Sequence, residues 1–215
     1  MKENKLLSGY MLLRLQKALV INSFKTKKES KDLIKKAKKI TTELITKVEN
    51  LNPKNPLAGN IQFAFPIIAV WLASNKTINI EEINQLIATA LKSPVVKLFY
   101  SGWNFNKESD AKAFQTKMKK ASEWHKAHKD DSYGWDFEFD DNLHKEGCYY
   151  AFRFCPIADF CKKNGFQEIA PVLCSIDYAT FGLCHGKLIR EKTLAKGDDM
   201  CDFWIVGDKS YNNKN

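Results

Sequence analysis

The sequence predicts an α+β fold, in which a helical N-terminal half packs on a mostly antiparallel sheet with two inserted helices. Up to about residue 130, apolar residues recur at spacings of three and four, which is the period of amphipathic helices. From Tyr133 to Asp140, aromatic and polar residues alternate, which is the period of a strand. Strand-like and helix-like segments then follow one another to about residue 206.

The chain is expected to form a single domain, 1–215. Hydrophobic residues make up 44% of it and aromatic residues 12%, which suffices for one core. The change of period near Ser132 divides this domain into a helical subdomain, 1–130, and an α+β subdomain, 131–208. The second subdomain is expected to carry the functional site.

The first expected helix carries an apolar stripe on one side and lysines on the other, and Asn52-Pro53 should end it. The formal net charge is +9, and the lysines are concentrated in 25–47. We expect them to form a solvated helix face, although binding of RNA or an anionic membrane is the alternative. The stripe consists of Leu33, Ala37, Ile40, Leu44, Val48 and Leu51.

Three further helices are expected before residue 130. The apolar segment 61–73 predicts a buried helix that is bent or started at Pro66. Asn79 and Glu82 have the spacing of a capping box at the start of the next helix, which Ser93-Pro94 should end. The last of the three spans about 107–129.

The C-terminal part is expected to read strand, strand, helix, helix, strand, strand. The second strand covers 148–154, and Cys155-Pro156 then opens a short helix that Asn164-Gly165 closes. A second helix runs from Glu168 to about Phe181. The last two strands, 188–195 and 200–206, are expected to pair through a turn at Lys196–Asp199.

Six cysteines are expected to be reduced thiols of a cytoplasmic protein, because the sequence opens without the apolar region of a signal peptide. The run 61–73 is too short to span a bilayer. No phosphate-binding glycine loop, zinc-protease motif or closely spaced cysteine pair occurs, so no cofactor and no metal are expected. We expect a small-molecule substrate and neither nucleic acid nor membrane as partner, and a homo-oligomer stays open.

The polar groups that carry the most chemistry lie in the C-terminal third. Cys155 begins a helix, where the helix dipole favours a thiolate, although a small buried cap is the alternative. Cys174 and Asp177 share a helix face, so the acid can polarise the thiol, bind a cation or simply lie exposed. The neighbours Cys201 and Asp202 begin a strand and face opposite sides, and a structural ion pair with Arg190 would explain Asp202 without chemistry.

These residues together resemble the L-2-amino-thiazoline-4-carboxylic acid hydrolase family. The resemblance rests on "CPIADFCKKNGFQEIAPVLCSIDYA" (155–179) and "REKTLAKGDDMCDF" (190–203). It implies hydrolysis of a cyclic isothiourea, in which the carbon between sulfur and two nitrogens is attacked, the C–S bond breaks and N-carbamoyl-L-cysteine forms. The matching positions are Cys155, Gly165, Glu168, Cys174, Asp177, Arg190, Thr193, Gly197, Cys201, Asp202 and Phe203.

The implied roles follow from that chemistry. A carboxylate, Asp177 or Asp202, would stabilise the protonated amidine group, and a cysteine thiolate or a carboxylate-activated water would attack. We rank Cys174 first as the nucleophile, then Cys155, then Cys201. Arg190 or Arg153 would hold the substrate carboxylate, with Thr193 as a further substrate-binding residue. A non-enzymatic domain that binds or senses a small ligand is the alternative function.

Overall fold

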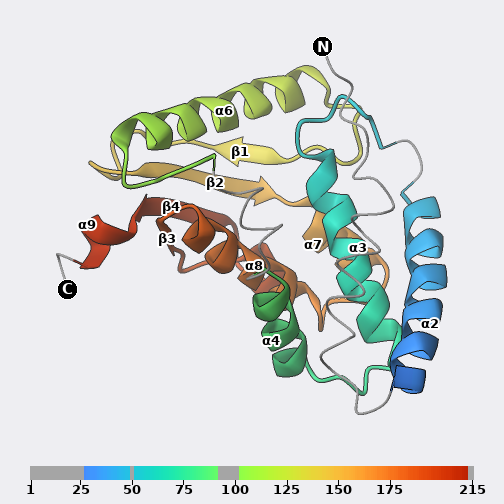
Figure 1. Cartoon of the computed structure of the whole chain (residues 1–215). Coiled ribbons are helices and arrows are strands. Elements are labelled where there is room, and N and C mark those ends of the chain that lie inside the picture. The colour runs from blue at the N-terminus through green and yellow to red at the C-terminus, as the bar shows by residue number, and fades with distance from the viewer. Residues whose placement is uncertain (1–26, 49–50, 92–101, 213–215) are drawn as a thin grey trace. The chain divides into compact units, whose positions relative to one another are not determined.

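The computed structural model describes residues 27–48, 51–91 and 102–212 (Figure 1). It confirms the predicted α+β fold: helices accompany a four-stranded antiparallel sheet of order β1-β2-β4-β3. The predicted helix stop at Ser93-Pro94 lies outside the described residues.

Helix α2 (Lys27–Thr46) packs against helix α3 (Ala58–Ala73) through the predicted apolar stripe, of which Leu33, Ala37 and Leu44 are buried. The helix ends at Thr46, earlier than Asn52-Pro53. At that point the hydrogen bonding changes to the 3₁₀ type, because the N–H of Val48 donates to the carbonyl of Ile45, three residues back.

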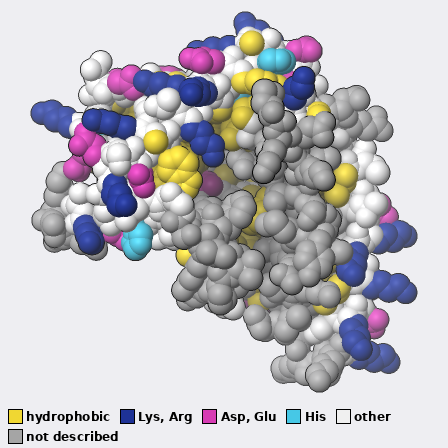
Figure 2. All heavy atoms as spheres, turned by 45° about the horizontal axis from the view of Figure 1, so that its top comes forward, with side chains coloured by type: hydrophobic (Ala, Val, Ile, Leu, Met, Phe, Trp, Pro, Cys, Tyr) yellow, Lys and Arg dark blue, Asp and Glu magenta, His cyan; other side chains and the backbone are white. Residues whose placement is uncertain are grey.

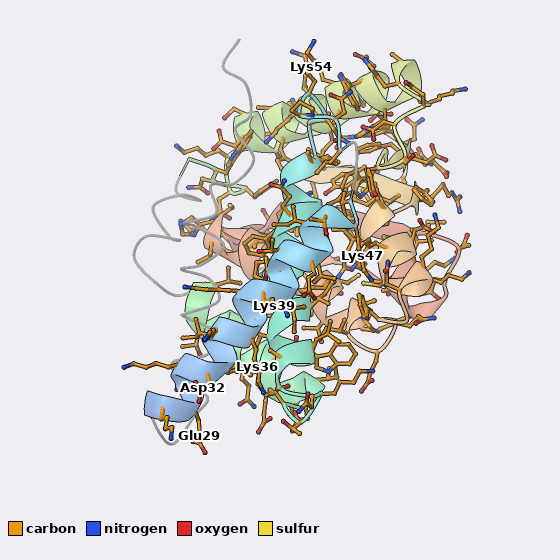
Figure 3. The ribbon with its side chains drawn as sticks, turned by 90° about the vertical axis from the view of Figure 1, so that its right-hand side faces the viewer. Glu29, Asp32, Lys36, Lys39, Lys47 and Lys54 are labelled. Atoms are coloured by element: carbon orange, nitrogen blue, oxygen red, sulfur yellow. The ribbon has the colours of Figure 1, made fainter. Side chains whose placement is uncertain are left out.

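The lysines of α2 lie on its exposed side, as the sequence predicts. Figure 3 shows Lys36 and Lys39 on this helix and Lys47 just beyond its end, with Glu29 and Asp32 nearer its start. Glu29 lies in the first turn of α2, where a negative charge interacts favourably with the helix dipole. In Figure 2, acidic side chains stand among the basic ones on the described surface.

Helix α3 is buried along most of its length and contains Pro66, and α4 (Ile80–Leu91) follows it. The predicted capping box is present at the start of α4: the N–H of Glu82 donates to Asn79 Oδ1 at 2.8 Å, and the N–H of Asn79 donates to Glu82 Oε2 at 3.1 Å. Within the described ranges, no helix combines the length and the apolar character that crossing a membrane requires.

The sheet consists of β1 (Asp136–Glu138), β2 (Cys148–Phe154), β3 (Gly186–Ile189) and β4 (Cys201–Gly207), all paired antiparallel. Strand β4 is the last in the sequence but lies between β2 and β3 (Figure 1). Two helices are inserted between β2 and β3, as predicted: α7 (156–163) and α8 (170–183). The short helix α9 (208–212) follows β4.

The predicted tight hairpin at 196–199 is wrong. Strand β3 ends at Ile189, and residues 190–200 form a longer connection that contains a 3₁₀ turn (Leu194–Lys196). The physical reason lies at Asp202, whose carboxylate accepts the N–H groups of Glu191 and Lys192. These N–H groups therefore bond a side chain instead of continuing the strand ladder.

The chain divides into two compact units, which differ from the expected subdomains 1–130 and 131–208. Helices α2, α3 and most of α4 lie in one unit, with residues 131–133. Helix α6 (Glu108–Ala127) belongs with the sheet in the other, because it packs on β1 and β2. Phe114 of this helix lies 6.4 Å from the ring of Tyr150 on β2.

Candidate active site

The strand register shows which side chains of β4 share a face of the sheet. Cys201 is opposite Phe152 and Phe203 is opposite Tyr150, so these four side chains share one face. Asp202, between them in sequence, points to the other face. Helix α8 lies on this face of Cys201 and Tyr150. Phe181, near the end of α8, packs 5.7 Å from the ring of Phe114 of α6, which in turn contacts Tyr150.

Arg190, just beyond β3, is held by helix α8. Its Nη1 donates to Asp177 Oδ2 at 2.8 Å, and its Nη2 donates to the carbonyl oxygen of Cys174 at 2.5 Å. The guanidinium also lies 4.9 Å from the ring centre of Tyr178 and 5.0 Å from that of Phe203. The side chain is only 2% exposed. Arg190 thus pairs with Asp177, and the expected ion pair with Asp202 is not formed.

Two thiols meet between α8 and β4. The thiols of Cys174 and Cys201 are close enough for each to shift the pKa of the other. The sulfur of Cys201 accepts the backbone N–H of Leu194 at 3.2 Å. Cys155, the N-cap residue of α7, lies close enough for the charges of Cys201 and Asp177 to raise its pKa, and its own charge raises the pKa of Cys174.

The surroundings separate the acidities of these three thiols. The hydrogen bond from Cys174, the N–H of Leu194 and the charge of Arg190 lower the pKa of Cys201, against the opposing effect of burial. Donating that hydrogen bond, together with burial and the nearby Asp177, raises the pKa of Cys174. Cys201 is therefore the member of this pair that ionises first.

The expected activation of Cys155 by its helix start is reversed. Burial raises the pKa of Cys155 to about 12, although the backbone N–H groups of Ala158 and Ile157 lower it. The dehydration of a thiolate outweighs the helix dipole here. Cys155 is consequently a protonated thiol at neutral pH.

Asp177 is a partly exposed acid whose partner, Arg190, is buried. Burial raises its pKa, and the charge and hydrogen bond of Arg190 partly oppose that rise. Its side chain is 36% exposed, and its Oδ2 accepts the hydrogen bond from Arg190 Nη1.

Three other candidate residues lie away from the thiols or have structural partners. Asp202 accepts backbone N–H groups on the opposite face of the sheet, the shortest from Lys192 at 2.7 Å. Arg153 is exposed and forms ion pairs with Glu138 and, at 2.8 Å, with Asp199.

Thr193 precedes the 3₁₀ turn and is buried, and its N–H donates to Asp198 Oδ2 at 2.7 Å. Its buried hydroxyl oxygen has no hydrogen-bond partner among the residues that the structure describes. A buried hydroxyl without a partner is costly.

The sequence interpretation missed two features of this site. Tyr178 and Phe203 enclose the guanidinium of Arg190, and only the adjacency of Tyr178 to Asp177 hinted at it. The N–H of Leu194 had no side-chain signal at all, since any residue can supply it.

Helix α6 and the segment 140–149 line a separate hollow of about 410 Å³. It contains none of the predicted site residues. In the part of the chain described, no group of three or more His, Cys, Asp or Glu side chains is arranged to hold a metal ion.

The site residues all lie within or beside a segment that matches a known family. The family model of L-2-amino-thiazoline-4-carboxylic acid hydrolase matches residues 60–205. The chain belongs to this family. The match runs from α3 to β4 and so includes every residue of the thiol and ion-pair cluster. No curated protein and no solved structure matches the chain. The family name indicates a hydrolase and a thiazoline substrate for the family, and the assignment agrees with the resemblance seen in the sequence.

Proposed function

We propose that the protein hydrolyses a small heterocycle of the cyclic isothiourea or amidine type, with the thiolate of Cys201 as nucleophile. One observation carries the proposal. The sulfur of Cys201 accepts the N–H of Leu194 at 3.2 Å, and a hydrogen bond from Cys174 and the charge of Arg190 lower its pKa. Two donors and a nearby cation are the surroundings that favour a reactive thiolate. Cys201 thereby moves from last to first in the expected order of nucleophiles.

The reaction would proceed in two steps. The thiolate attacks the ring carbon that lies between the sulfur and the two nitrogens, and the ring C–S bond breaks, releasing the substrate sulfur as a thiolate. Cys174, a protonated thiol, can supply a proton to that sulfur. Water then adds to the same carbon and expels Cys201, which leaves a carbamoyl group on the substrate nitrogen. The net change is addition of one water molecule.

Asp177 would prepare the substrate for attack. An amidine carbon becomes more electrophilic when its nitrogens are protonated, and a carboxylate beside it stabilises that cation. The partial exposure of the Asp177 side chain supports this role. The two Nη atoms of Arg190 bond Asp177 and the Cys174 carbonyl and its side chain is only 2% exposed, so it would orient the acid instead of holding the substrate carboxylate. Thr193 is the candidate for a direct polar contact.

The test is turnover of a panel of thiazolines and cyclic amidines by purified protein. Loss of turnover is expected in Cys201→Ser, Cys174→Ser and Asp177→Asn with the fold intact. The matched control is Cys184→Ser, since this cysteine ends the same helix but has no part in the cluster. Full turnover in Cys201→Ala would contradict thiolate attack and favour an activated water. Tight binding without turnover across the panel would favour the ligand-binding alternative.

A further inference from the structure

Helix α2 carries a row of lysines along one flank of its exposed side. The lysines recur at spacings of three, four and three residues, so they follow one another along the helix over about 15 Å and within a narrow arc of its circumference. All of them are exposed, and in the described part of the chain none of them forms an ion pair. The residues of this lysine row are Lys28, Lys31, Lys35 and Lys38.

The acidic residues of α2 lie on the other flank. Since successive residues are turned by about 100° around the helix axis, each acid is turned by roughly 80° or more from the middle of the lysine row. Lys39, which lies between the two flanks, forms the ion pair with Glu43, at 4.0 Å. The positive charge of the row is therefore not balanced by the acids of its own helix. These acids are Glu29, Asp32 and Glu43.

An exposed apolar side chain continues the row. Ile45 comes seven residues after Lys38, which is nearly two full turns, so both lie on the same line of the helix. Among the described residues of α2, Ile45 is the one large hydrophobic residue that is exposed, at 40%. The interface of a lipid bilayer accepts both apolar and cationic groups, whereas the backbone of a nucleic acid attracts the charges alone.

We propose that the lysine row and Ile45 form a surface that binds an anionic lipid bilayer, with α2 lying along the bilayer plane. The anionic headgroups would neutralise the lysines, and Ile45 would reach the boundary between headgroups and acyl chains. The apolar stripe of α2 stays packed against α3, so the protein attaches peripherally without inserting this helix. The proposal replaces the expectation from the sequence that the protein has no membrane partner.

The composition of α2 favours a bilayer over a nucleic acid. The helix contains no arginine and no aromatic residue. Arginine forks read base edges and aromatic rings stack on unpaired bases, so α2 lacks both means of recognition. Lysine ammonium groups act as point charges that any anionic surface attracts. Each lysine held close to an anionic bilayer increases the binding constant about fivefold, and the row supplies four such residues.

The experiment measures co-sedimentation of the purified full-length protein with vesicles. Binding is expected to vesicles of phosphatidylcholine and phosphatidylserine, and not to vesicles of phosphatidylcholine alone. Added salt should release the protein, because exposed charges are then screened. The partition coefficient should fall by about two orders of magnitude or more when the row is neutralised. This row variant combines Lys28→Gln, Lys31→Gln, Lys35→Gln and Lys38→Gln.

The matched control neutralises the same number of exposed lysines on α6. It has the same net charge as the row variant, so an effect of the surface itself appears only in the row variant. Circular dichroism checks that both variants fold. Equal losses of vesicle binding in the two variants would show that net charge alone attracts the protein and would overturn the proposal. The control combines Lys112→Gln, Lys117→Gln, Lys120→Gln and Lys126→Gln.

Ile45 separates a bilayer from a nucleic acid as the partner. Ile45→Ser should weaken binding to the phosphatidylserine vesicles severalfold, because the apolar contact is lost, and an unchanged partition coefficient would contradict the proposed orientation of α2. Binding of a single-stranded RNA oligomer without sedimentation on these vesicles would overturn the proposal in favour of a nucleic-acid surface. No substrate takes part in these measurements, so their outcome is independent of the proposed hydrolysis.

Discussion

Arg190 and Asp177 form an ion pair in which the cation is almost fully buried and the acid is only partly so, with 2.8 Å between Nη1 and Oδ2. The guanidinium has a second bond to the Cys174 carbonyl, so this one side chain ties the connection after β3 to helix α8.

The first prediction concerns the stability that this pair provides. Arg190→Met is expected to lower the free energy of unfolding by about 2 kcal/mol, at the low end for a broken buried pair because Asp177 is partly exposed. Arg153→Met is the matched control, since its two ion pairs are exposed, and it should cost no more than about 1 kcal/mol. Urea denaturation of both variants measures the difference, and equal losses would contradict the assignment.

The two aspartates of the family motifs should behave differently. Asp202→Ala removes the acceptor of two backbone N–H groups and should destabilise the protein by about 1–2 kcal/mol. The folded fraction should keep its turnover, because this carboxylate faces away from the thiols. Asp177→Ala should abolish turnover in protein that remains folded. Turnover per folded molecule, with unfolding curves for both variants, separates these roles.

The reactivity of Cys201 should depend on pH in a defined direction. Its pKa is lowered by the hydrogen bond from Cys174, so its alkylation rate should rise with pH and level off below the range usual for cysteine. Cys174→Ala removes that donor and should shift the rise to higher pH. Alkylation by iodoacetamide, followed by mass spectrometry at a series of pH values, measures both curves. Superimposed curves would mean that Cys174 does not tune Cys201.

Asp177 should make the stability of the protein fall as pH rises. Burial raises its pKa, so the folded state binds this proton more tightly than the unfolded state does. The contribution is fully present below the ordinary aspartate pKa and is lost as pH rises through the raised pKa. Asp177→Asn should lack this dependence. Denaturation midpoints are measured over the acidic pH range for the wild type and the variant. The two plots of midpoint against pH should diverge, and parallel plots would contradict this role of Asp177.

Gly147 and Gly165 both have positive φ but differ in the space available for a Cβ atom. Gly147 has φ of 77°, and a Cβ there would lie 2.1 Å from the carbonyl oxygen of Ile205. Gly165 has φ of 71° with no atom within 4 Å of the corresponding position. Gly165→Ala should therefore cost only about 1–2 kcal/mol of backbone strain, and Gly147→Ala considerably more. Thermal unfolding of both variants measures their losses of stability. A smaller loss in Gly147→Ala than in Gly165→Ala would contradict this prediction.

The features that sequence could predict are set by neighbouring residues. The box of Asn79 and Glu82 and the proline after Cys155 act within one helical turn, so their spacing identifies the helix starts. The long connection after β3 could not be predicted in this way. It depends on Asp202 taking N–H groups ten and eleven residues away, which no local pattern reveals.

The candidate site was predictable as a set of residues but not as an electrostatic arrangement. Motif spacing brought Cys155, Cys174 and Cys201 into consideration together. The partner of Arg190 and the order of thiol acidity depend on which side chains are buried against which helix, and that is known only from the tertiary structure.

The position of β4 in the sheet also has a consequence during synthesis. This strand is made after all the others, yet it supplies hydrogen bonds to both β2 and β3. A nascent chain that has not reached residue 201 therefore exposes two unpaired strand edges and lacks Cys201. Such a chain is prone to association through those edges. Premature termination before this strand would yield an aggregating product that lacks the proposed nucleophile, instead of a partly active one.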